Sequence, residues 1–291
     1  MTPTDLNFLR KMIQDKSGIV LGDDKLYLFE SRLTPVCQRQ GLNDLGQLVQ
    51  RLREKANSPL HAEVVESMTT NETFWFRDGA PFDALKEKVL PFLAGANQST
   101  RKLAIWCAAS STGQEPYTIA MIIRDHFPQL ASWQLQFLAT DLSPRVIAKA
   151  RAGRYTQAEV DRGLAPDLLK RHFSQVASGE WQVNENLRKM WEFRELNLLE
   201  SWFNLGTYDI VFIRNVLIYF NTEVKSQLLM RVGKVLAPHG FLYLGGAESP
   251  LNLDSQWVRV HFDRAGLYRK LRSDEAPPKD PKSGRWPAVT V

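Results

Sequence analysis

The residues best placed to do chemistry lie between Lys102 and Ile123, in the segment KLAIWCAASSTGQEPYTIAMII. A short apolar run, a turn of small residues and a helix start with an early proline predict the first strand–turn–helix of a nucleotide-binding fold. The turn carries only Gly113 and lacks the second glycine that lets a backbone approach a dinucleotide pyrophosphate. Glu115, at the helix start, would repel a phosphate and attract a cation. The segment therefore favours a cationic adenosine ligand such as S-adenosylmethionine, with an ordinary strand–turn–helix without ligand as the alternative.

Asp141 is a second acid at the end of a predicted strand. The strand from Trp133 to Ala139 leads into Thr-Asp-Leu-Ser-Pro, residues 140–144. In such folds an acid at the tip of the second strand accepts hydrogen bonds from ribose hydroxyls. The same residues are typical of a helix N-cap. Both roles can hold at once, with Ser143 capping the helix and Asp141 binding the ligand.

Residues 69–78, Thr-Thr-Asn-Glu-Thr-Phe-Trp-Phe-Arg-Asp, follow neither a helical nor a strand period. Asn71 and Thr73 offer side-chain hydrogen bonds, and Arg77 offers a planar fork that suits carboxylates. The segment is either part of a binding site or a hinge between domains whose aromatic side chains fill the seam.

Arg214, Asn215 and Tyr219 follow a buried strand predicted for Asp209–Ile213. Ligands of open α/β sheets bind at the edge formed by the carboxyl ends of the strands. Because these three residues come directly after such a strand, we expect them at that edge.

The elements that must position these residues begin with a helical region, residues 1–90, in which apolar residues recur at helical spacing. Arg32 and Arg39 lie two turns apart on one helical face, which either docks on an acidic partner or is simply solvated. A Gly/Asn/Ser-rich stretch near residues 95–100 is the expected domain boundary. Residues 91–272 alternate strands and helices, with a small antiparallel wing inserted at about 152–190. Within this region residues 238–240 are expected to end a helix, residues 241–245 form the fifth predicted strand, and residues 266–269 are expected as a last edge strand. The proline-rich tail, residues 273–291, is expected to be disordered.

Composition limits the class of protein. The 291 residues are 44% hydrophobic and 24% charged, which is typical of a globular protein with a sizeable core. No apolar run approaches the roughly 20 residues of a membrane span, and the N-terminus does not resemble a signal peptide. Cys37 and Cys107 have no metal-ligand spacing, so we expect no metal and a reducing, cytoplasmic location. The formal charge of +5 mildly favours an acidic partner.

Five segments together resemble the CheR-type chemotaxis methyltransferases, which methylate glutamate side chains of bacterial chemoreceptors. In chain order they are TNETFWFR, WCAASSTGQEPYT, ATDLS, ELNLLE and IRNVLIYF, and the resemblance runs from about Leu6 to Leu271. It implies an α/β fold, with a class I S-adenosylmethionine-dependent methyltransferase (Rossmann-like) domain, an N-terminal all-helical domain and a small inserted antiparallel β-subdomain of three strands.

The resemblance also implies roles for individual residues. S-adenosylmethionine would be held by the residues that match the family's binding positions, namely Asn71, Thr73, Arg77, Glu115, Asp141, Asn197, Leu198, Arg214 and Asn215. Gln114 departs from the family's Gly-Glu-Glu-Pro motif, whereas its second, binding acid is retained as Glu115. Arg77 and Tyr219 match the arginine and tyrosine near the transferred methyl group, so they are the catalytic candidates. The family's basic N-terminal face favours receptor docking through Arg32 and Arg39.

The implied reaction transfers a methyl group from S-adenosylmethionine to a glutamate carboxylate and leaves S-adenosylhomocysteine, without a metal. Implied partners are the cytoplasmic helical bundle of chemoreceptors and a regulatory adaptor protein. We expect a monomer at membrane receptor arrays that neither inserts into the membrane nor binds nucleic acid. The short wing near residues 177–180 favours independence from the C-terminal pentapeptide of some receptors. The alternatives are a non-catalytic S-adenosylmethionine-binding signalling module and a methyltransferase of another acidic protein.

Overall fold

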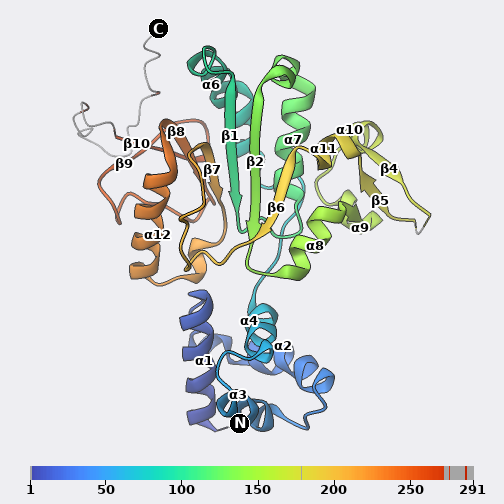
Figure 1. Ribbon diagram of the computed structural model, residues 1–291, viewed down its shortest axis with the longest axis vertical. Helices are drawn as coiled ribbons and strands as arrows, with labels where there is room; N and C mark the ends of the chain where they lie inside the picture. Colours follow the sequence, from blue (N-terminus) through green and yellow to red (C-terminus); the bar gives the residue numbers. More distant parts are fainter. Residues whose placement is uncertain (1, 178, 272–274, 276–285, 287–291) are drawn as a thin grey trace. The chain divides into compact units, whose positions relative to one another are not determined.

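The computed structural model describes residues 2–177 and 179–271, together with residues 275 and 286. They form two compact units (Figure 1). The first comprises the chain up to Thr70 with Asn197–Ser201 and Tyr219–Val224, and the second comprises Asn71–Leu196, Trp202–Ile218 and the chain from Lys225. The domain bounds expected from the sequence stay a prediction. The expected disorder of the tail concerns residues that, apart from 275 and 286, lie outside the described ones.

Helices build most of the first unit. They are α1 (Pro3–Ser17), the 3-10 helix η1 (Asp23–Lys25), α2 (Leu26–Arg39), α3 (Leu45–Glu54) and α4 (Pro59–Met68). Thr2 and Asp5 form a capping box at the start of α1, and the Asp44 side chain caps α3. The apolar residues predicted to share helical faces supply a core whose fully buried members include Leu9, Ile13, Phe29, Leu33, Leu48 and Val49. Val64 of α4 is buried in the same core.

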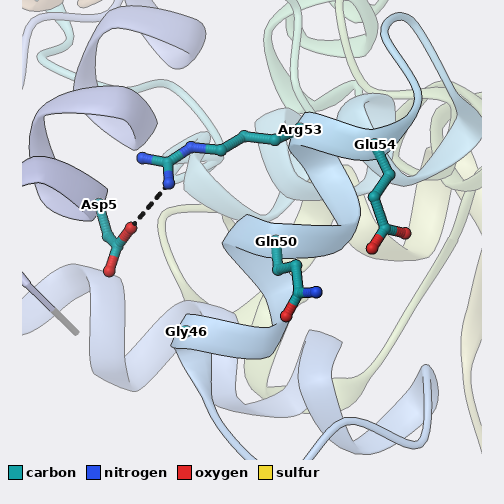
Figure 2. A pocket seen from close by; sticks show the side chains of 5 residues that line it. All are labelled: Asp5, Gly46, Gln50, Arg53 and Glu54. Carbon is teal, nitrogen blue, oxygen red and sulfur yellow. Dashed lines mark ion pairs between the residues drawn. The ribbon is translucent and has the colours of Figure 1, made fainter.

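An ion pair joins α1 to α3 at the surface of this unit. The Arg53 guanidinium lies 3.2 Å from the Asp5 carboxylate and 4.9 Å from the centre of the Phe8 ring. This pair borders a depression lined by Asp5, Gly46, Gln50, Arg53 and Glu54 (Figure 2). Because both signs of charge line the depression and Arg53 is already paired, we assign no ligand to it.

A seven-stranded sheet forms the centre of the second unit. In spatial order its strands are β6 (Trp191–Glu195), β2 (Gln134–Asp141), β1 (Lys102–Ala108), β7 (Tyr208–Ile213), β8 (Leu236–Leu244), β10 (Gly266–Lys270) and β9 (Trp257–Arg259). The first five run parallel, and β10 is antiparallel to both of its neighbours. The chain order reverses between β1 and β7, which is the switch point where ligands bind in such sheets.

Helical segments precede the first strand of the second unit and connect the later ones. They are α5 (Ala80–Ala84), the π-helical η2 (Leu85–Val89), α6 (Leu90–Ala96), α7 (Gln114–His126), η3 (Pro128–Ser132), α8 (Pro144–Ala152), α9 (Gln157–Asp161), α10 (Pro166–His172), α11 (Glu185–Arg188) and α12 (Thr222–Val235), whose first residues belong to the first unit. A further 3-10 turn, η4, spans Leu217–Tyr219. Helix α8 packs against β2 and β6 (Figure 1).

The chain between β2 and β6 forms a second, antiparallel sheet, while β2 and β6 themselves are paired neighbours in the large sheet. The order of the second sheet is β3 (Arg154–Tyr155), β5 (Trp181–Val183) and β4 (Phe173–Gln175). The α/β class, the helical N-terminal part and the small three-stranded subdomain are therefore confirmed. Within the described residues, no helix has the length and apolar character needed to cross a membrane.

Three local expectations for the second unit differ from the structure. The strand at Gly266–Arg269 was expected at the sheet edge, but β10 lies between β8 and β9. Residues 238–240, expected to end a helix, lie within β8, because Leu236 already pairs with Tyr208 across an irregular register. The expected linker near residues 95–100 still contains the end of α6. The first two differences depend on pairing with residues distant in sequence, which a local pattern does not reveal.

Asp209 connects the start of β7 to β1 and to the end of α6. Its carboxylate accepts hydrogen bonds from the backbone N–H of Ala104 at 2.8 Å and from the side-chain amide of Asn97 at 3.0 Å. The residue is 9% exposed. A buried carboxylate needs such donors to offset its lost hydration, so this contact stabilises the sheet at the end opposite the ligand-binding edge.

We expect Asp209→Asn to lower the free energy of unfolding by about 1–3 kcal/mol, because the amide keeps the size of the side chain but leaves one donor unpaired. Urea unfolding at pH 7 measures this change. The control is Glu192→Gln on β6, whose side chain is 62% exposed, and which should change stability by less than about 0.5 kcal/mol. Equal stability of Asp209→Asn and the wild type would contradict the role given to this carboxylate.

Candidate active site

The turn between β1 and α7 has an unusual backbone. Ala109, Ser111 and Gly113 have φ values of 54°, 51° and 94°, a left-handed region that residues other than glycine seldom adopt. At Gly113 an added Cβ would lie 2.9 Å from the Cβ of Ala150 in α8, so glycine is also required for space. The Tyr155 hydroxyl donates a hydrogen bond to a backbone carbonyl of the turn at 2.7 Å. The turn is thus held in a fixed, tight shape at the switch point of the sheet.

Asp141 fixes the same turn from the end of β2. One carboxylate oxygen accepts a hydrogen bond from the Ser111 N–H at 2.8 Å, and the other accepts from the Ser143 N–H at 3.0 Å. The Ser111 hydroxyl in turn donates to the Asn71 carbonyl at 2.7 Å. The Ser143 side chain caps α8, as expected from the sequence. Two predicted cofactor residues, Asn71 and Asp141, are therefore brought together through Ser111.

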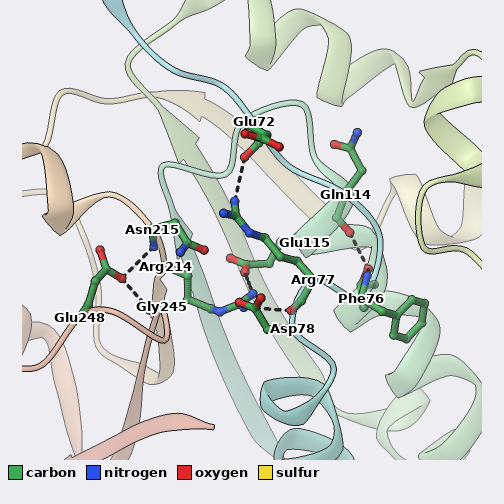
Figure 3. Close-up of polar contacts among 11 residues, drawn as sticks. Glu72, Phe76, Arg77, Asp78, Gln114, Glu115, Arg214, Asn215, Gly245 and Glu248 are labelled. Atoms are coloured by element: carbon green, nitrogen blue, oxygen red, sulfur yellow. Dashed lines mark hydrogen bonds and ion pairs between the residues drawn. The ribbon is translucent and has the colours of Figure 1, made fainter. Parts of the chain in front are cut away.

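Arg214 is the most enclosed charged side chain of the site, with 2% of its side chain exposed. Its guanidinium donates to the carboxylates of Glu115 and Asp78, both at 2.7 Å, and to the Arg77 carbonyl at 2.9 Å (Figure 3). It also lies 5.5 Å from the centre of the Phe82 ring. Arg214, the residue directly after β7, thus ties the start of α7 to the irregular segment that precedes α5.

Carboxylates outnumber the cations around this contact. Burial raises the pKa of Glu115 above its ordinary value, and the negative charge of Glu248 adds to the rise, while Arg214 and Arg77 oppose it. Asp78 shares the same Arg214 guanidinium. A site that already stabilises Glu115 incompletely would gain from a bound cation, which agrees with the ligand charge inferred from the sequence.

Arg77 lies in the irregular segment at residues 71–79. Its guanidinium donates to the Glu72 carbonyl at 2.9 Å and lies 5.6 Å from the centre of the Phe74 ring (Figure 3). The Arg162 guanidinium lies 4.7 Å from the same ring and pairs with the Glu72 carboxylate at 2.5 Å. Thr73, which lies between Glu72 and Phe74 in the sequence, is partly buried. Cation–aromatic contacts and an ion pair therefore order a segment that has no regular secondary structure.

Trp75 anchors this segment to the small sheet. Its indole N–H donates to the Glu159 carbonyl at 3.0 Å, and its ring packs edge-on against Tyr155 and Phe173 at 4.9 and 5.3 Å. Trp75 has no exposed surface. Trp75 thus packs inside the second unit, and the expectation of a hinge whose aromatic side chains fill a seam between domains stays a prediction.

Asn215 and Glu248 form a contact of which the sequence motifs predicted only Asn215. Asn215, a predicted cofactor residue, has a φ of 59°, and its N–H donates to the Glu248 carboxylate at 2.8 Å (Figure 3). Glu248 was not a candidate. The available signal was its position shortly after the fifth predicted strand, in Gly-Gly-Ala-Glu, at the same edge of the sheet.

Three predicted site residues belong to the first unit. The Asn197 side chain donates to the Lys16 carbonyl at 2.6 Å, Leu198 is buried, and the Tyr219 carbonyl accepts from the Val20 N–H at 2.9 Å. That they join the residues of the second unit around one cofactor stays a prediction.

The two docking candidates also lie in the first unit, and both have partners there. Arg32 donates to the carbonyls of Met68 and Thr69 at 2.8 and 3.0 Å, which fastens α2 to the end of α4. Arg39 pairs with Glu63 at 2.8 Å and keeps 55% of its side chain exposed. Docking through this face stays a prediction, in which Arg39 is the more accessible of the two.

The residues present fit a polar cationic ligand. Among the described residues, three buried polar atoms near the carboxyl ends of β1, β7 and β8 have no hydrogen-bond partner in the protein, namely Ser110 Oγ, Arg214 Nε and Tyr243 Oη. Unsatisfied buried polar atoms are rare in folded proteins and call for an explanation such as a ligand or water. No cluster of three or more metal-binding side chains occurs in the part of the chain that is described.

Fold, turn and charge together define a Rossmann-like methyltransferase domain that binds S-adenosylmethionine. The family model described as "CheR methyltransferase, SAM binding domain" matches residues 71–264, and "CheR methyltransferase, all-alpha domain" matches residues 4–69. The chain therefore belongs to the CheR methyltransferase family, as the sequence motifs predicted.

Similar curated proteins carry matching names. Chemotaxis protein methyltransferase 1 of Pseudomonas aeruginosa is 45% identical over 269 residues, covering 91% of this chain and 97% of that protein. Chemotaxis protein methyltransferase Cher2 of Pseudomonas putida is 41% identical over 269 residues, again covering 91% of this chain and 97% of that protein. Chemotaxis protein methyltransferase 1 of Vibrio cholerae is 39% identical, covering 89% of this chain and 94% of that protein. Methylation within chemotaxis, with S-adenosylmethionine as donor, follows from this kinship.

Gly113→Ala should destabilise the protein by about 2–4 kcal/mol, because the left-handed φ and the contact with Ala150 each penalise a Cβ. The control is Gly95→Ala within α6, where an added Cβ has no atom within 4 Å. That variant should be neutral or more stable by up to about 1 kcal/mol. Urea unfolding compares the two variants, and an equal effect of both would contradict the constraint placed on the turn.

Arg214→Met should lower the free energy of unfolding by about 3–5 kcal/mol at pH 7, because buried Glu115 loses its cation. The loss should shrink as the pH is lowered towards the ordinary Glu value of 4.5, since the raised pKa lets Glu115 take up a proton there. Arg39→Met removes an exposed pair instead and should cost less than about 1 kcal/mol. Chemical denaturation at several pH values measures both variants, and a loss at Arg214 no larger than at Arg39 would contradict the role of Arg214 as the cation that compensates buried Glu115.

Proposed function

We propose that this protein methylates glutamate side chains of chemoreceptors and so takes part in chemotaxis adaptation. The observation that supports this most is the polar cluster of Arg77, Glu115 and Arg214 at the ligand-binding edge, in a chain that belongs to a chemotaxis methyltransferase family. The printed names of its relatives state chemotaxis and methyl transfer. The chemical nature of the acceptor is inferred from the residues of the site.

The cofactor would be held by the binding residues inferred from the sequence: Asn71, Thr73, Arg77, Glu115, Asp141, Asn197, Leu198, Arg214 and Asn215. In this proposal Asp141 faces the ribose hydroxyls, and Glu115 balances positive charge on the ligand. When bound, the cofactor supplies a methyl group on a sulfonium, which a carboxylate oxygen can take up as the carbon–sulfur bond breaks and its electron pair returns to sulfur.

A glutamate acceptor places modest demands on the protein. Its ordinary pKa of about 4.3 means that it is ionised at neutral pH, so no general base is required. The protein must align the reacting atoms and exclude water. Arg77 would orient the acceptor carboxylate or neutralise the carboxylate of the cofactor. Tyr219 would position the acceptor or contact the sulfonium.

An arginine after the fourth strand of the parallel sheet also favours a carboxylate over a nucleobase. Methyltransferases of exocyclic amines in nucleic acids carry an Asn/Asp-Pro-Pro-aromatic motif at this point, whose carbonyls accept from the amine. Residues 214–217 read Arg-Asn-Val-Leu instead. A non-catalytic S-adenosylmethionine-binding module is less well supported, because a protein without activity would have no reason to keep Arg77, Glu115, Asp141 and Tyr219 in its sequence.

We further propose that the enzyme methylates receptors without needing their C-terminal pentapeptide. The support is the short connection between β4, which ends at Gln175, and β5, which begins at Trp181. In this proposal the protein works as a monomer in the cytoplasm at receptor arrays, with Arg32 and Arg39 facing the acidic receptor helices. A regulatory adaptor protein is a further partner in this proposal.

The test incubates the protein with radiolabelled S-adenosylmethionine and membranes that carry chemoreceptors. We expect label on the receptor that mild base releases as methanol, because a glutamate methyl ester is base-labile. Arg77→Ala should lose at least about tenfold in rate, as expected when an orienting contact is removed, while its thermal unfolding changes little.

Two further arms complete this test. Receptors with and without the C-terminal five residues should be methylated equally, and dependence on those residues would refute pentapeptide independence. Label that resists base, or label on protein other than receptors, would refute the glutamate assignment. Wild-type turnover in Arg77→Ala would remove that residue from the site.

A further inference from the structure

The carboxylate of Glu248 is surrounded by backbone N–H groups. One oxygen accepts from Asn215 at 2.8 Å and from Gly245 at 2.6 Å, and the other accepts from Val216 at 2.9 Å and from Ile218 at 3.3 Å. Glu248 is 6% exposed. Four donors on one buried carboxylate form an anion-binding nest whose anion is a side chain of the protein itself.

This nest fixes the chain directly after β7. Three of the four donors belong to residues 215–218, and Asn215 has a left-handed φ of 59°. Such a conformation persists only where surrounding contacts enforce it. The preceding residue, Arg214, reaches Glu115 and Asp78 with its guanidinium. The direction in which Arg214 leaves the sheet is thus set by a turn that Glu248 holds.

Gly245 shows how closely the parts of the nest fit. An added Cβ at this position would lie 2.6 Å from the side-chain nitrogen of Asn215 and 2.7 Å from the Glu248 carboxylate. Any residue with a side chain at position 245 would therefore clash with Asn215 and Glu248. Figure 3 shows these three residues next to one another. Glu248 also lies near enough to Glu115 for its charge to raise the pKa of that carboxyl, so the nest adjoins the candidate cofactor site.

We propose that Glu248 is a positioning residue for methyl transfer, which acts by holding the turn at Asn215 and, through it, the Arg214–Asn215 side of the cofactor site. This inference rests on the proposed function, in which Arg214 and Asn215 contact S-adenosylmethionine. Glu248 itself contacts neither cofactor nor acceptor in this assignment.

The test compares Glu248→Gln with Asp209→Asn. Both changes neutralise a buried carboxylate that accepts hydrogen bonds from backbone N–H groups or a side-chain amide. The two residues lie towards opposite ends of the paired strands β7 and β8. Isothermal titration with S-adenosylhomocysteine measures the dissociation constant of each variant below its unfolding temperature. We expect Glu248→Gln to bind about 10- to 100-fold more weakly, the range for a lost partner of buried donors, and Asp209→Asn to bind as the wild type does.

A double-variant cycle identifies the route of the effect. If Glu248 acts through Asn215, Glu248→Gln should weaken binding much less in an Asn215→Gly background than in the wild type. In steady-state methylation, Glu248→Gln should raise the KM for S-adenosylmethionine more than it lowers kcat. Glu248→Asp, which keeps the charge, should recover part of the affinity, and it replaces the glutamine variant if that variant does not fold.

The outcomes separate this inference from the proposed function. Unchanged affinity in folded Glu248→Gln, or equal weakening in Asp209→Asn, overturns the positioning role even if the wild type is an active methyltransferase. Additive effects of the Glu248 and Asn215 changes overturn the route through Asn215. A wild-type protein that binds S-adenosylhomocysteine but methylates no receptor overturns the proposed substrate and leaves the binding comparison intact.

Discussion

The candidate site depends on the need to compensate one buried guanidinium. Arg214 is almost without exposed surface, and its charge is balanced by Glu115 at the start of α7 and by Asp78 in the irregular segment. A charge in such a place is tolerated only with close partners. Since the contact joins Arg214 to residues 77–78 and to Glu115, it fixes three separate stretches of chain in one geometry. The same contact leaves an excess of carboxylates, and that excess suits a cationic cofactor.

Two further carboxylates hold the backbone on either side of this contact. Asp141 accepts N–H groups of the turn after β1, and Glu248 accepts N–H groups of the turn after β7. Both turns contain left-handed residues other than glycine, namely Ser111 and Asn215. Each such residue costs about 1–3 kcal/mol, and hydrogen bonds to a buried carboxylate offset that strain. The edge of the sheet is thus shaped by acids that bind the protein's own backbone, and the position of a cofactor on this edge would follow from them.

The irregular segment before α5 shows how a chain without periodicity can still be well ordered. Trp75 is buried against the small sheet, whereas the Phe74 ring contacts the guanidinium groups of both Arg77 and Arg162. The segment therefore connects the small antiparallel sheet with the contact of Arg214. The small sheet and the candidate cofactor site share these residues, which gives a physical reason for such a dense run of aromatic and polar side chains.

The sequence by itself determined the class of fold and most candidate residues. Periodicity and turn chemistry are local properties, so they predicted the helical N-terminal part, the alternation of strands and helices along the chain, and the placing of Asp141 and Arg214 at the ends of strands. The motifs predicted the family. Only the tertiary structure revealed β9 at the sheet edge, the early start of β8 and the partners of Arg214. It also revealed the role of Glu248, because four N–H groups converge on that carboxylate only when β7 and β8 lie side by side. Contacts between residues far apart in the chain leave no period in the sequence, and such contacts decide which charge is buried and which turn is held.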